Sequence, residues 1–104
     1  MTTPEQEQQL LHDKLNMETA PIAWSELLRY FAGGHVIAVG NELDLIDVAS
    51  RFAADDARVV QQWLNEGSIK RVSDEQARAW LEADAMLWTV VARPWVLVQE
   101  SKPT

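Results

Sequence analysis

Between Leu43 and Val72 the chain carries two short segments with helical apolar periodicity, a tight joint, and a candidate strand. Each helical segment places its apolar residues on one face, as a helix packed on a core does. Asp55 or Asp56 supplies the N-cap of the second helix. In chain order the elements are a helix over 43–54, a joint at Asp55 and Asp56, a helix over 57–65 that ends at Gly67, and a strand over 69–72. The apolar side of the second helix consists of Val59, Val60, Trp63 and Leu64. This order limits the fold to those that pack a helix pair against a sheet.

Further elements flank this unit on both sides. An apolar stripe predicts a helix from Ala20 to Ala32, with Thr19 as its cap and Pro21 in its first turn. Gly33 and Gly34 end it, and residues 35–39 form a buried strand. Ser73 with Gln76 is a capping box, which predicts a helix from 73 to 83.

The last segment, Leu87 to Glu100, is rich in β-branched and aromatic residues. Pro94 interrupts it and cannot donate a ladder hydrogen bond, so it marks a turn, a bulge or an edge. A hairpin and a single kinked strand both remain open.

The complete order is helix, strand, helix, helix, strand, helix, strands. It predicts a small single α+β domain, with winged-helix-like helices packed on a small antiparallel β-sheet. We expect this domain to cover residues 15–100, with a flexible acidic N-terminal arm at 1–14 and a tail at 101–104.

The composition disfavours several classes of function and of binding site. The 104 residues hold 16 acidic and 9 basic side chains, a formal net charge of −7, and no Cys. An acidic surface repels phosphate backbones and anionic lipid. Without Cys there are no disulfides, thiolate zinc sites or cysteine nucleophiles. No apolar run approaches the length of a membrane span and no signal-like start is present, so we expect a cytoplasmic protein with no membrane contact.

Two resemblances are visible. Residues 46–49 and 59–69, with Ala49, Val59 and Gly67 at the expected spacing, resemble the helix-turn-helix of excisionase-like winged proteins. From about Leu15 to Glu100 the chain resembles a small bacterial family, domain of unknown function 2288. The segments that carry this resemblance are 15–20, 22–24, 43–45, 54–56, 72–77 and 94–100. The family resemblance implies no activity, ligand or catalytic residues.

Nucleic-acid binding is disfavoured. A reading helix needs cations for phosphates and polar side chains for base edges. The second helix of the pair instead begins with Asp55 and Asp56, which repel the backbone that a helix N-terminus meets. A degenerate winged-helix DNA-binding or transcription-related regulator remains the first alternative.

No residues are predicted to be catalytic, cofactor-binding or metal-ligating. Glu42, Asp44 and Asp47 cluster at a helix start, but they lack calcium-loop spacing and suit the helix dipole. His12 and His35 belong to no ligand spacing, and no nucleophile motif is present. A small metal-dependent or unrecognised enzyme remains the second alternative.

The Trp residues suggest a binding surface. Trp24, Trp63 and Trp80 lie on apolar helical stripes and are expected in the core. The last β segment offers an aromatic and arginine combination that is enriched at contact hot spots. We therefore predict a non-catalytic protein-interaction module that binds a protein partner or forms a homodimer. Its predicted surface comprises Trp88, Arg93, Trp95 and Val96. The competing interpretation is that Trp88 and Trp95 both fill the inner face of the sheet.

Overall fold

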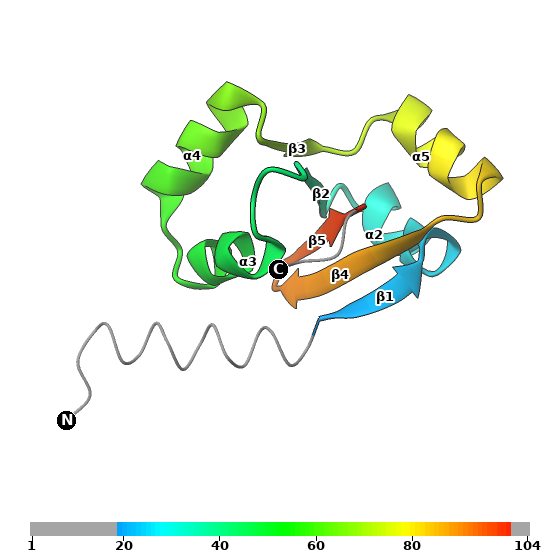
Figure 1. Ribbon diagram of the computed structural model, residues 1–104, viewed down its shortest axis with the longest axis horizontal. Coiled ribbons are helices and arrows are strands. Elements are labelled where there is room, and N and C mark those ends of the chain that lie inside the picture. Colours follow the sequence, from blue (N-terminus) through cyan, green and yellow to red (C-terminus); the bar gives the residue numbers. More distant parts are fainter. Residues whose placement is uncertain (1–18, 101–104) are drawn as a thin grey trace.

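The computed structural model describes residues 19–100 and has one sheet with helices on both faces (Figure 1). The predicted arm 1–14 and tail 101–104 lie outside the described residues. The elements are β1 (Ala20–Ala23), the 3-10 helix η1 (Trp24–Leu27), α2 (Leu28–Ala32), β2 (Val36–Val39), α3 (Leu45–Ala53), α4 (Ala57–Glu66), β3 (Ile69–Arg71), α5 (Asp74–Glu82), β4 (Met86–Ala92) and β5 (Trp95–Gln99). The predicted α+β class is confirmed.

The sheet has the strand order β1-β4-β5-β2-β3 and is mixed. β2 and β5 run parallel, whereas the other three pairs are antiparallel. The prediction of a wholly antiparallel sheet was therefore wrong. The last segment forms two antiparallel strands, β4 and β5. β5 is the strand that pairs with β2, and it runs in the same direction as β2.

The C-terminal segment is a hairpin, which answers the question that the sequence left open. β4 and β5 pair antiparallel, with Ala92 opposite Trp95, and Arg93 and Pro94 form the two-residue turn. The peptide bond between Arg93 and Pro94 is cis. Pro94 therefore sits in a turn, where no ladder hydrogen bond is needed.

The predicted helix 20–32 was wrong in its first half. Residues 20–23 form β1, which pairs antiparallel with β4 and places Ile22 opposite Leu87. The helical turns begin only at Trp24. Trp24 and Leu27 keep the buried positions that the stripe predicted, while Leu28 is exposed. Pairing with β4 supplies backbone hydrogen bonds that outweigh the local helix signal.

Two helix caps, Asp56 and Ser73, were predicted, whereas Asp44 caps a helix that begins at Leu45 and not at the predicted Leu43. Asp44, Asp56 and Ser73 each accept a hydrogen bond from a backbone N–H in the first turn of α3, α4 and α5. Gly67 ends α4 in the left-handed conformation, with φ of 77°. Among residues 19–100 the longest helix is α4 with ten residues, so none of these helices could cross a membrane.

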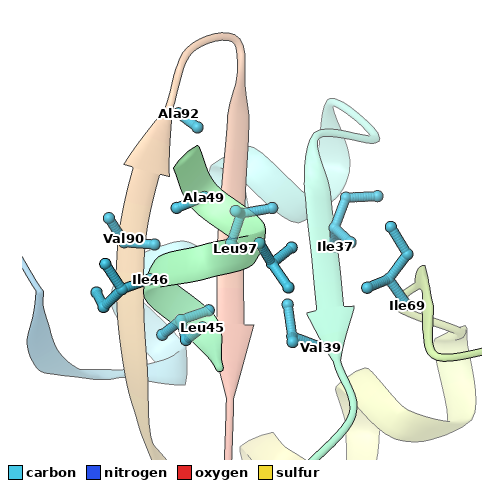
Figure 2. Packing of buried hydrophobic residues seen from close by; sticks show 10 residues of the cluster. Ile37, Val39, Leu45, Ile46, Ala49, Ile69, Val90, Ala92 and Leu97 are labelled. Carbon is cyan, nitrogen blue, oxygen red and sulfur yellow. The ribbon is translucent and has the colours of Figure 1, made fainter. Parts of the chain in front are cut away.

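Each face of the sheet carries its own core. On the α3 side, Leu45, Ile46 and Ala49 point at the apolar side chains of β4, β5 and β2 (Figure 2). On the other face, η1 and α5 cover Val36, Val96 and Val98. Successive residues of β5 alternate between the two cores, as they must in a strand. A sheet covered on both faces explains why its central strands are almost wholly apolar.

Candidate protein-interaction groove

A mostly apolar groove of about 280 Å³ opens between α3, α4 and the β2–β3 edge of the sheet. In Figure 1, α3 and α4 (green) lie at one end of the molecule, away from α5 (yellow). Ile37, which belongs to the α3-side core in Figure 2, is the groove's buried residue. The lining residues are Ile37, Phe52, Asp55, Asp56, Ala57, Val60, Leu64, Arg71 and Trp95.

The groove exists because α4 covers its neighbours incompletely. The helix is amphipathic, yet no residue of α4 is fully buried. Val60 and Trp63 pack against the α3-side core, but Leu64 is 40% exposed. The prediction that Val59, Val60, Trp63 and Leu64 form a buried side therefore needs correction. Since one helix face lines both the core and the groove, part of its apolar stripe is left exposed.

Trp95, at the start of β5, is held in one orientation by its neighbours. Its ring makes edge-to-face contacts with Phe52 and His35, with centroids 6.2 and 6.1 Å away. The Arg71 guanidinium carbon lies 5.8 Å from the centroid of the same ring, a cation–π distance. The indole is thus half-buried, and three neighbouring side chains contact its ring.

Two of the three charged residues that line the groove are already engaged. Asp56 accepts from the backbone N–H of Val59 and pairs with Arg51, each at 3.4 Å. Arg71 sits over Trp95. Asp55 is exposed, and within residues 19–100 its carboxylate has no hydrogen bond or ion pair. It is the one free charge among the residues lining the groove.

The four residues of the predicted surface lie in different surroundings. Trp95 lines the groove, and Arg93 is exposed on the adjacent turn. Trp88 is half-buried against the α3-side core, opposite Gln99 in the sheet and outside the groove lining. Val96 is 2% exposed and belongs to the other core, so it has no surface to offer. That correction follows from the sheet having both faces covered.

Sequence reasoning missed the rest of the groove. Val60 and Leu64 were assigned to the apolar side of their helix, and neither Phe52 nor Arg71 was predicted to belong to a site. A core stripe and a half-open stripe have the same periodicity, because periodicity reports a face and not what covers it. The adjacency of Arg71 and Trp95 depends on the β2–β3 and β2–β5 pairings, which no local pattern specifies.

A second groove, of about 340 Å³, lies at the carboxyl ends of β2 and β5 and reaches the start of α5. Its polar groups largely satisfy one another. The Gln99 Nε2 donates to the carbonyls of Gly40 and Leu43, and the Trp80 Nε1 donates to Glu100. The remaining charges there, such as Lys70 and Glu42, have opposite signs. This groove therefore selects no single class of ligand.

The exposed face of α4 offers little to nucleic acid. The amide of Gln61 donates to Asn65, and that of Gln62 donates to Glu66, at 3.0 and 3.1 Å. These are the side chains that would read bases, and they are paired with each other along the helix. Arg58 is the one cation on α4. Within the described chain, no three His, Cys, Asp or Glu residues lie close enough to hold a metal ion.

Comparison with known proteins gives a family and a fold relative. The model of a family described as "Protein of unknown function (DUF2288)" matches residues 10–100. The NMR solution structure of PA1075 from Pseudomonas aeruginosa is 39% identical in sequence, with a TM-score of 0.77. The match covers 98% of this chain and 94% of that one. The comparison with curated proteins gave no match. The resemblance to winged helix-turn-helix proteins is not confirmed.

Proposed function

Because the chain belongs to the DUF2288 family, whose description names no activity, we propose a function from the groove: a non-catalytic module that binds a segment of another protein. The observation that carries this proposal is the open apolar stripe of α4 facing the oriented ring of Trp95. Aromatic residues fixed in a desolvated pocket are the usual anchors of protein contacts.

The size of the groove supports an anchor site. About 280 Å³ lies just below the range of small-molecule pockets, and it suits one or two apolar side chains of a partner. The half-buried Trp95 and the exposed Leu64 provide the walls. Around them, the polar side chains of Asp55, Asp56 and Arg71 form a rim, as in protein interfaces generally.

The chemistry of the lining also favours binding over catalysis. The groove is lined by no Ser, Cys, His or Lys side chain of residues 19–100, so it lacks the usual nucleophiles and the commonest general base. Of its two carboxylates, Asp56 is held by the helix end and by Arg51.

Site-specific photocrosslinking in cells that express the protein tests the proposal. A benzoylphenylalanine in place of Leu64 places the probe on the groove. The same probe in place of Leu81, on α5, is the matched control, since Leu81 is 48% exposed on a different helix. We expect a discrete heterologous product from position 64 that position 81 does not give.

A further Phe52→Ala substitution should reduce the yield from position 64, because it removes one wall of the groove. Equal products from positions 64 and 81, or none from 64, would contradict a binding groove. A product that consists of two copies of this chain would replace the heterologous partner by self-association.

A further inference from the structure

We propose that the groove selects a segment that carries an apolar anchor residue and a nearby Lys or Arg, with the cation paired to Asp55. This inference rests on the proposed function and specifies the chemistry of the partner. It makes Asp55 a specificity-determining residue, whereas Trp95 and Leu64 provide affinity for the anchor.

The charge left over in the groove is negative. Asp56 is neutralised by Arg51 at 3.4 Å, and the Arg71 guanidinium lies over the Trp95 ring. No ion pair joins Asp55 to Arg71 within residues 19–100. A partner cation near Asp55 therefore gains an unsatisfied carboxylate, whereas a partner anion near Arg71 competes with a contact that already exists.

The backbone of Asp55 is held in place at the groove. The residue adopts φ of 59°, at the joint between α3 and α4. The backbone is held on both sides: the Asp55 N–H donates to the Phe52 carbonyl at 3.1 Å, and the Ala57 N–H donates to the Asp55 carbonyl at 2.9 Å. Because the side chain is short, its charge stays near the lining of the groove.

The long-range electrostatic field of the molecule also favours a basic partner segment. The chain has a net charge of −7. A basic segment is therefore attracted during diffusion, and an acidic segment is repelled. The overall charge and the free charge in the groove thus favour the same partner chemistry, even though Arg71 lies in the lining.

The test uses two acetylated and amidated pentapeptides, Gly-Leu-Trp-Lys-Gly and Gly-Leu-Trp-Glu-Gly, titrated into the ¹⁵N-labelled full chain at low salt. Binding is followed at the indole N–H of Trp95 and the backbone amide of Leu64. We expect both peptides to shift these signals, and the Lys peptide to bind about two- to fivefold more tightly, as an exposed ion pair allows.

The deciding variant is Asp55→Asn, because Asn tolerates a positive φ and removes only the charge. It should reduce the difference between the peptides, leaving only the part that comes from the net charge of the molecule. Asp84→Asn is the matched control, since Asp84 is also exposed with a positive φ of 51° but lies at the end of α5. It should leave the difference intact.

The outcomes separate the two proposals. If both peptides bind equally, if the Glu peptide binds more tightly, or if Asp55→Asn lowers the preference no more than Asp84→Asn does, the assignment of Asp55 is overturned while the groove remains a binding site. If neither peptide moves the Trp95 and Leu64 signals, the proposed function fails, and this inference fails with it.

Discussion

Gln99 fixes the loop that connects β2 to α3. It is 3% exposed, and its Nε2 donates to the carbonyls of Gly40 and Leu43 at 2.8 and 2.7 Å. The Gly40 carbonyl also accepts from the Leu43 N–H at 3.1 Å, so the side chain of Gln99 and this turn hydrogen bond together hold the loop. The loop in turn sets where α3 begins, and α3 forms one wall of the groove.

We expect Gln99→Met to lower the free energy of unfolding by about 1–3 kcal/mol. Met keeps the length of the side chain but removes the donor to the Leu43 carbonyl and one of the two donors to the Gly40 carbonyl. Urea denaturation followed by Trp fluorescence measures the change. Gln61→Met is the control, because Gln61 is exposed on α4, and its effect should stay within about 0.5 kcal/mol. Equal effects at both positions would refute the role of Gln99.

At the scale of elements, α4 and α3 have nearly the same length but different support. α3 buries four residues in the core, whereas α4 buries none. α4 depends instead on its ends, which are the Asp56 cap and the left-handed Gly67. A short helix with little tertiary burial opens more readily than one that is packed into a core.

Native-state hydrogen exchange should therefore show α4 amides exchanging faster than those of α3, with α5 in between because it buries two residues. Asp56→Ala should speed exchange in α4 further and cost about 1 kcal/mol. Ser73→Ala provides the comparison, since it should act on α5 alone. If α3 and α4 exchanged at the same rate, the half-open packing described for α4 would be incorrect.

The sequence predicts the elements that depend on local signals and fails where pairing decides. The helices from Ala57 and Asp74 begin directly after Asp56 and Ser73, which the sequence predicts as caps. β1 could not be predicted, because Pro21 and the apolar stripe favour a helix until β4, far along the chain, offers hydrogen bonds. The parallel pairing of β2 with β5 is equally non-local, so the sheet was predicted as antiparallel.

At the scale of the whole molecule, some residues of the candidate site could be predicted from local sequence, whereas others depend on the complete fold. Trp95 and Arg93 could be selected from sequence, because their residue types are typical of contact surfaces. Val96 was selected in error, since a strand residue faces solvent only if one sheet face is bare. Asp55 lies between α3 and α4, Arg71 lies on β3 and Trp95 lies on β5, yet all three line the same groove. Their grouping is a property of the complete fold.

Net charge is the remaining whole-molecule property, and salt should affect folding and binding in opposite directions. With a net charge of −7, the acidic side chains of the native state repel one another. NaCl between 0.05 and 0.5 M should screen this repulsion and raise Tm. The same salt should weaken binding of the Lys pentapeptide and bring its affinity toward that of the Glu pentapeptide. Thermal unfolding and the NMR titration measure the two effects on one sample.

Chloride is the appropriate anion for this experiment, because sulfate would stabilise the protein by strengthening apolar burial. KCl should reproduce the NaCl result, since screening depends on ionic strength and not on the identity of the cation. A Tm that falls with added salt would mean that attraction between charges outweighs repulsion in the folded chain. The acidic field could then no longer be an argument for a basic partner, and Asp55 alone would have to account for the preference.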